Sequence, residues 1–254
     1  MSDVLIGHTG FVGSNLAEQR KFDLCVNSKN IDDLKGGHFD TVVCAGVSAV
    51  KWKANKNPEE DAAGIAALTD VLDTITAKRM VLISTVDVFQ IPAGQDEHSP
   101  SDTASLHPYG RHRLSLEDRI STQFKHSNIV RLPALFGPRL RKNILFDLKN
   151  NNMVNVINPA SSFQWYPLAR LWADLKTVID ADLPLVHFAT EPVSTADILA
   201  LFFLNMNVGS KPVPEAHYDF HTLHASIFGG THPYILDRAE VLEALREWMV
   251  GDSK

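Results

Sequence analysis

The chain has 254 residues, of which 44% are hydrophobic and 21% are charged, and its formal net charge is −6. This length and composition suit one large α/β domain with a small appendage, with enough apolar residues for a substantial core. The acidic balance argues against nucleic acid as a partner, because proteins that bind it nonspecifically carry an excess of positive charge.

Two features favour a cytoplasmic protein that does not contact the membrane. The sequence shows no N-terminal hydrophobic signal and no apolar stretch of the ~18–20 residues that a membrane span needs. Its two cysteines, Cys25 and Cys44, lie in apolar strand-like runs, which is typical of core thiols in a reducing compartment.

The first motif is a glycine-rich segment at 7–13 (GHTGFVG), which follows an apolar run and precedes a helix-like segment. A strand, a glycine-rich turn and the start of a helix can place a pyrophosphate at a helix N-terminus. Gly7 allows a sharp turn, Gly10 a close approach of the phosphates, and Gly13 close packing of helix on strand. A plain tight turn is the alternative. We predict a dinucleotide site that includes Gly7, Thr9, Gly10, Phe11, Val12 and Gly13.

The end of the second predicted strand, residues 22–26, indicates which dinucleotide to expect. An acid at this point would bind the 2′-hydroxyl of NAD, but the first acid after the strand is Asp32. Asn27, Ser28 and Lys29 stand there instead, and Ser28 and Lys29 can hydrogen-bond and neutralise a 2′-phosphate. We therefore predict NADP as the preferred cofactor and NAD as the alternative. An ordinary exposed lysine at position 29 would fit the same residues.

The third predicted strand, residues 40–46, is a near-continuous apolar run, as expected for a strand buried on both faces of a parallel sheet. Ala45 and Gly46 stand at its carboxyl end, where open α/β sheets bind ligands, and their small size leaves room for a cofactor. Residues 51–53 (KWK) are expected in a loop with a packed tryptophan. A helix should then begin after Asn57, with Asn57 as its N-cap.

A candidate proton-transfer site follows. Ser84 and Thr85 end the strand predicted over 80–83, and Tyr109 and Arg113 lie four residues apart on one face of a predicted helix. A neighbouring cation, together with the charge of an oxidised nicotinamide, would favour the phenolate of a tyrosine, whose ordinary pKa is ~10, and allow proton transfer near neutral pH. In this interpretation Thr85 holds a substrate oxygen and Tyr109 is the acid or base. A tyrosine that merely packs at a helix start is the alternative.

Four segments in this order resemble the motifs of the extended short-chain dehydrogenases/reductases, the family of nucleotide-sugar epimerases, dehydratases and reductases. They are GHTGFVG at 7–13, STVDVF at 84–89, YGRHR at 109–113 and RLPALFGP at 131–138. The resemblance implies an α/β fold with a doubly wound Rossmann-type parallel sheet and a small C-terminal substrate lobe. It also implies a division into a dinucleotide-binding domain at 1–150 and a substrate lobe at 151–254, interleaved with late Rossmann elements.

The same resemblance implies roles for individual residues. Thr85 takes the position of the catalytic hydroxyl and Tyr109 that of the acid/base, while Pro133 and Leu135 fall in the segment near the nicotinamide. The family has a lysine where this chain has Arg113. The lysine binds the nicotinamide ribose and lowers the tyrosine pKa, and arginine can do both electrostatically, although its fork is larger and keeps its proton.

We therefore expect an NAD(P)-dependent oxidoreductase that acts as a reductase or an epimerase. It would move a hydride between the nicotinamide and a small, sugar-like substrate such as a nucleotide sugar. Asp87, Gln164 and Trp165 are candidates for substrate contact. One alternative is a cofactor-binding sensor that has lost turnover, which the exchange at Arg113 favours. A second is a nucleotide-sugar dehydratase using Asp87, although Val86 stands where some dehydratases carry a further acid.

Two further expectations concern metals and assembly. His217, His221 and His224 have spacings that one helical face would bring together, but no carboxylate motif accompanies them and the resembling family uses no metal, so we expect none. Helices that would follow Asn57 and His107 pair subunits in many members of that family, which implies a homodimer.

Overall fold

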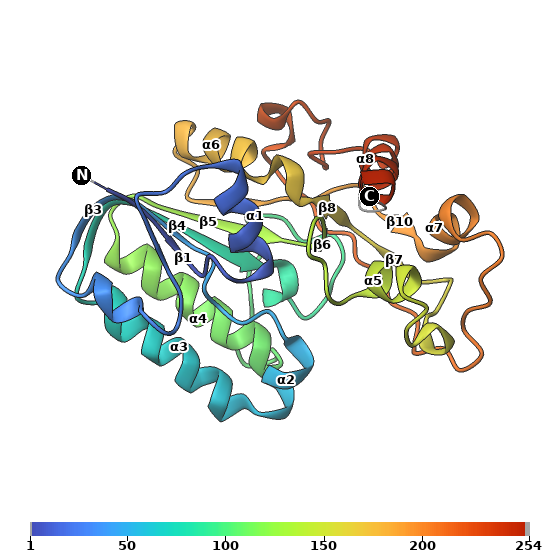
Figure 1. The fold of residues 1–254 in the computed structure, drawn as a ribbon, viewed down its shortest axis with the longest axis horizontal. Coiled ribbons are helices and arrows are strands. Elements are labelled where there is room, and N and C mark those ends of the chain that lie inside the picture. The colour runs from blue at the N-terminus through green and yellow to red at the C-terminus, as the bar shows by residue number, and fades with distance from the viewer. Residues whose placement is uncertain (1, 252–254) are drawn as a thin grey trace. The chain divides into compact units, whose positions relative to one another are not determined.

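Six parallel strands form the central sheet of the computed structural model, which describes residues 2–251 (Figure 1). In sheet order they are β2 (Leu24–Val26), β1 (Asp3–Ile6), β3 (His38–Cys44), β4 (Thr76–Thr85), β5 (Ser127–Leu132) and β9 (Leu185–His187). The strand order reverses at β1, as in doubly wound sheets. Ile6 pairs with Cys44, and Cys44 pairs with Leu82, so the carboxyl ends of β1, β3 and β4 meet at one edge. The predicted fold class is confirmed.

Helices cover both faces of this sheet (Figure 1). Helices α3 (Pro58–Leu72) and α4 (Pro108–Gln123) pack together on one face, and α1 (Phe11–Gln19) and α6 (Leu171–Asp180) pack together on the other. Three short elements complete this part of the chain: α2 (Lys51–Lys56) and the 3-10 helices η1 (Ile31–Leu34) and η2 (Val86–Val88). Since η2 follows β4 directly, the segment 84–89 continues beyond the edge of the sheet.

The remaining elements form a smaller α/β unit. Its strands pair as β6 (Ala134–Phe136) with β8 (Trp165–Pro167) and as β7 (Ser162–Phe163) with β10 (Val193–Ser194). Its helices are α5 (Ile144–Lys149), α7 (Thr195–Phe202) and α8 (Arg238–Gly251), with 3-10 turns η3 (Val154–Val156) and η5 (Ala225–Phe228), while η4 (Leu168–Arg170) leads back toward α6. Aromatic side chains, among them Trp165, Tyr166 and Phe188, are fully buried in this unit.

By its internal contacts the chain divides into two discontinuous units. The first holds 1–91, 98–132 and 169–187, and the second holds 92–97, 133–168 and 188–254. The central sheet and the candidate residues Thr85, Tyr109 and Arg113 therefore lie in the first unit. A functional boundary at residue 150 stays a prediction.

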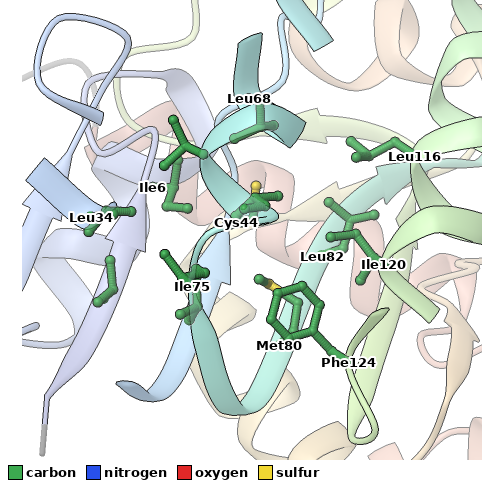
Figure 2. Packing of buried hydrophobic residues seen from close by; sticks show 14 of the residues in the cluster. Ile6, Leu34, Cys44, Leu68, Ile75, Met80, Leu82, Leu116, Ile120 and Phe124 are labelled. Atoms are coloured by element: carbon green, nitrogen blue, oxygen red, sulfur yellow. The ribbon is translucent and has the colours of Figure 1, made fainter. Parts of the chain in front are cut away.

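The core of the first unit lies between the sheet and the pair of helices α3 and α4 (Figure 2). Strand residues such as Cys44, Met80 and Leu82 are almost fully buried and pack with Leu68 of α3 and Ile120 of α4. Consecutive buried residues occur along β3 and β4, as the apolar runs predict for strands covered on both faces. This packing fixes the edge of the sheet from which the site is built.

Two local predictions at residues 51–53 were wrong. Residues 51–53 begin helix α2 instead of lying in a loop, and Trp52 is exposed. Helix α3 begins after Asn57 as predicted, with Asn57 at the N-cap position, but the Asn57 side chain makes no capping hydrogen bond. Helix α5 begins at Ile144, where Asn143 adopts a positive φ of 105° and caps the helix.

Cys25 and Cys44 are both free thiols, and burial raises the pKa of Cys44 to about 11. Such thiols are poor nucleophiles near neutral pH. Every helix within residues 2–251 is too short or too polar to cross a membrane.

Leu82→Ala should destabilise the first unit by ~2–5 kcal/mol, because it leaves a cavity between β4 and the helices. Urea unfolding followed by circular dichroism measures the change. Ile91→Ala is the control: Ile91 is 63% exposed and belongs to the same unit, so its loss should change stability by no more than ~0.5 kcal/mol. Equal losses in the two variants would contradict the assigned core.

Candidate active site

The glycine loop leaves space for a ligand at the start of α1. A Cβ on Gly7, which has a φ of 87°, would lie 2.5 Å from the carbonyl oxygen of Ala45, and one on Gly13 would lie 2.2 Å from the Gly7 oxygen. The protein's own packing therefore requires glycine at both positions. A Cβ on Gly10 would meet only the Gly7 oxygen, at 3.3 Å. Gly10 thus borders open space where a phosphate can approach the backbone.

Helix α1 begins at this space without a group that would compete with an anion. Gly10 is its N-cap and makes no side-chain hydrogen bond, and the first turn carries no acidic residue. The Nδ1 atom of His8 is buried and has no hydrogen-bond partner within residues 2–251. A buried polar atom without a partner is expected beside a site that another molecule completes. The residues present therefore fit the pyrophosphate of a dinucleotide.

The turn after β2 presents Ser28 and Lys29 to solvent. Asn27 and Asn30 close this turn: the N–H of Asn27 donates to Oδ1 of Asn30, and Oδ1 of Asn27 accepts from the N–H of Lys29, each at 2.9 Å. Asn27 therefore shapes the turn, and the side chains of Ser28 and Lys29 remain exposed. At the end of β3, the N–H of Ala45 donates to the Ile6 oxygen at 2.9 Å, which keeps Ala45 and Gly46 beside the glycine loop.

The structure brings Thr85 and Tyr109 together. Oγ1 of Thr85 accepts the backbone N–H of Asp87 at 3.1 Å, so its hydroxyl proton is free for another oxygen. A hydrogen bond from Thr85 favours the phenolate of Tyr109, which places the two hydroxyl groups in contact. The N–H of Tyr109 donates to Oδ1 of Asn55 at 3.0 Å, and Gly110 packs so closely on η2 that a Cβ there would lie 2.2 Å from the Asp87 oxygen.

Arg113 lies beneath the ring of Tyr109, with its guanidinium carbon 3.9 Å from the ring centroid. Both oxygens of Asp61 accept from this guanidinium, and the backbone oxygens of Ser48 and Tyr109 accept two further bonds. Sequence reasoning missed Asp61, which lies in α3, because nothing in its local pattern distinguishes it from the other acids of the first helical turn.

A second ion pair stands close to the phenol. Nζ of Lys51 lies 2.7 Å from Oδ1 of Asp87, and the charges of both residues act on Tyr109 and on His107. The ring of His107 caps α4, since its Nδ1 accepts the N–H of Gly110 at 3.0 Å. Burial, followed by the charge of Lys51, lowers the pKa of His107. His107 is therefore a neutral side chain at neutral pH.

Burial is the largest effect on Tyr109, which is 6% exposed, and it raises the phenol pKa above its ordinary value of 10.0. Arg113, Thr85 and Lys51 act in the opposite direction and do not outweigh it, while Asp87 adds to the rise. In this state the phenol holds its proton at neutral pH. The neighbouring cations alone therefore do not depress the phenol pKa, and a depressed pKa beside an oxidised nicotinamide stays a prediction.

Ser84, the neighbour of Thr85, points to a different group. Its hydroxyl donates to Glu117 of α4, and Glu117 accepts a bidentate pair of bonds from Arg131 of β5, with Nη2 2.6 Å from Oε2 and Nε 3.2 Å from Oε1. Nη1 of Arg131 lies 3.3 Å from His187 of β9. This buried network ties α4 to three strands and holds the helix that carries Tyr109.

The remaining candidates belong to the second unit. The Gln164 amide is buried and bonds the backbone of Thr190 and Phe220, so it pins loops together. Trp165 is buried too, and its indole nitrogen has no partner within residues 2–251. Pro133 and Leu135 are half-buried in and before β6. Their predicted contacts with substrate or nicotinamide stay predictions.

The histidines of this unit do not converge. His217 bonds Ser162 and Glu215, and His221 lies 3.6 Å from Asp219. Within residues 2–251 no group of three or more metal-ligating side chains is gathered.

A profile of the NAD dependent epimerase/dehydratase family matches residues 17–160, more than half of the chain. This segment contains Thr85, Tyr109 and Arg113. A search of curated protein sequences finds no significant match.

Solved structures with the same fold cover nearly the whole chain. An NAD dependent NDP-hexosamine 5,6-dehydratase involved in tunicamycin biosynthesis has a TM-score of 0.73 at 16% identity and covers 99% of this chain and 98% of its own. UDP-glucose 4-epimerase from Thermotoga maritima, solved with UDP-glucose, has a TM-score of 0.71 at 13% identity over 100% of both chains. dTDP-4-dehydrorhamnose reductase from Bacillus anthracis str. Ames, solved with NADP, has a TM-score of 0.69 at 18% identity. It covers 98% of this chain and 97% of its own.

The prediction of NADP or NAD as cofactor is confirmed at this level, and so is that of an enzyme; the preference for NADP stays a prediction. The chain belongs to the NAD-dependent epimerase/dehydratase family and is an NAD(P)-dependent enzyme of the oxidoreductase type.

Proposed function

We propose that the protein is a reductase that converts the carbonyl group of a nucleoside-diphosphate sugar to an alcohol, with NADPH as the preferred hydride donor. The observation that carries this proposal is the pairing of the buried Tyr109 phenol with the hydroxyl group of Thr85, at a position where burial raises the phenol pKa. Reduction of a carbonyl requires a proton donor, and a protonated phenol can supply that proton.

In this mechanism the bound nicotinamide supplies the hydride, and the protein supplies the proton. Thr85 donates a hydrogen bond to the carbonyl oxygen and orients it toward Tyr109. Tyr109 then transfers its phenolic proton to that oxygen, and solvent returns a proton to the phenolate. The pair Lys51–Asp87 lies beside this position and offers a cation and a carboxylate to the hydroxyl groups of a sugar.

The substrate class rests on the family and on the fold. UDP-glucose, a dehydrorhamnose nucleotide and an NDP-hexosamine are named for proteins that share this fold at 13–18% identity. A dehydratase that uses Asp87 is a weaker candidate, because Lys51 already holds this carboxylate. We also propose a cytoplasmic homodimer that pairs through α3 and α4, which sedimentation equilibrium can test.

Gly10→Ala should fold normally but bind both NADPH and NADH at least ~10-fold more weakly, because its methyl group would occupy the path of the phosphates. Energy transfer from the tryptophans to the reduced nicotinamide measures binding. Gly64→Ala is the control, since a Cβ on Gly64 in α3 would lie in open space. Unchanged affinity in Gly10→Ala would argue against this cofactor site.

Lys29→Ala should weaken NADPH binding by ~10-fold and leave NADH binding unchanged, because a charge-assisted bond to the 2′-phosphate is lost. Lys35→Ala, which removes a lysine paired with Asp32 at 2.9 Å, serves as the matched control. If Lys29→Ala affected the two cofactors equally, the 2′-phosphate assignment would be wrong.

Tyr109→Phe should reduce turnover of keto sugar nucleotides by ~10²–10⁴-fold and leave NADPH binding intact, because only the proton donor is lost. Tyr218→Phe, a change in the second unit, is the control. In the wild type the reduction rate should fall as pH rises through the phenol pKa. Because burial raises this pKa, the fall should begin only above ~pH 10. A Tyr109-dependent fall between pH 6 and 8 would contradict the assignment.

A further inference from the structure

The ion pair beneath Tyr109 is closed off from solvent. The side chains of Arg113 and Asp61 are 4% and 6% exposed, and Nη2 of Arg113 donates to Oδ1 of Asp61 at 2.9 Å while Nη1 donates to Oδ2. His112 adds a contact of 2.8 Å to Oδ2. Burial acts to raise the pKa of Asp61, but bonds from Arg113 and His112 outweigh it and lower the pKa, so Asp61 is ionised at neutral pH.

This arrangement commits Arg113 to the protein. A guanidinium carries five N–H donors, and four hydrogen bonds from Arg113 already end on Asp61, Ser48 and Tyr109. A bidentate bond to a cofactor ribose would require Arg113 to give up these partners. One face of the guanidinium is also occupied, because it stacks on the Tyr109 ring with its central carbon 3.9 Å from the ring centroid.

We propose that Asp61 is a positioning residue of the site: it holds the guanidinium of Arg113 against the ring of Tyr109 and offsets the charge of that guanidinium. The inference rests on the proposed role of Tyr109 as proton donor. Asp61 binds Arg113 from α3, while Tyr109 and Arg113 lie on α4, so the ion pair also fixes the phenol relative to the neighbouring helix. Arg113, which stands where the resembling family has a lysine, then supports the Tyr109 ring and does not hold the ribose.

Other charged groups face the same phenol. Lys51 comes from α2, Asp87 from η2 and Arg113 from α4, while His107 precedes α4 and contacts the ring with a centroid distance of 6.1 Å. Lys51 and Asp87 form a pair of opposite charge at 2.7 Å. If the charge of Asp61 is removed, Arg113 therefore becomes a cation near the ring that has lost its carboxylate partner.

Asp61→Asn should lower the phenol pKa of Tyr109 by about one unit, because the charge of Arg113 is no longer offset. Ultraviolet absorbance of tyrosinate, taken as the difference from the same protein carrying Tyr109→Phe, measures this pKa without any substrate. In turnover, the alkaline fall of the reduction rate should move to lower pH by the same amount. Asp73→Asn is the matched control: Asp73 also joins α3 to α4, through Arg119, but at the surface.

An unchanged or higher phenol pKa in folded Asp61→Asn would overturn the proposal. If this variant does not fold, the double variant Asp61→Asn/Arg113→Gln leaves no unpaired charge, and its phenol pKa should differ from the wild type by less than about one unit. A rise of the phenol pKa by more than about one unit would show that Asp61 does not offset the charge of Arg113 in the wild type, and would overturn the proposal. Because these titrations need no substrate, they stand apart from the search for reductase activity: its failure would refute the proposed function and leave the measured role of Asp61 intact.

Discussion

The contact between the Tyr109 ring and the Arg113 guanidinium is the interaction on which the site depends. The guanidinium stacks on the buried ring, and burial raises the phenol pKa. Asp61 makes this possible, because an uncompensated guanidinium at 4% exposure would be too costly to bury. One turn further along α4, Glu117 binds Arg131 and secures the same helix to the sheet. Tyr109, the proposed proton donor, therefore lies on a helix held by two buried ion pairs, of which only the first touches its ring.

Much of the fold could be predicted because the relevant signals are local. The apolar run in β3 and the glycine spacing of residues 7–13 are visible over a few residues, and the four-residue step from Tyr109 to Arg113 is a property of any helix. The structure adds the reason for each glycine: Gly7 and Gly13 are required by backbone contacts, whereas Gly10 alone faces open space.

What could not be predicted depends on contacts between distant residues. Asp61 meets Arg113 across 52 positions, and Lys51 meets Asp87 across 36. No local pattern encodes either pair, and the expected loop at residues 51–53 is the helix that presents Lys51. The burial of the phenol, which raises its pKa, and the counter-ion of Arg113 also depend on distant residues and could not be predicted. The buried bonds of the Gln164 amide to the backbone of Thr190 and Phe220 also join distant residues, and no local pattern predicts them.

The most direct measurement is to incubate the enzyme with a keto sugar nucleotide and NADPH that carries deuterium at the transferable position, and to analyse both products. The account predicts that one NADPH is consumed for each alcohol formed and that the deuterium resides on the new carbinol carbon. Interconversion of two sugars without net consumption of NADPH, or loss of water from the substrate, would contradict the assignment as a reductase.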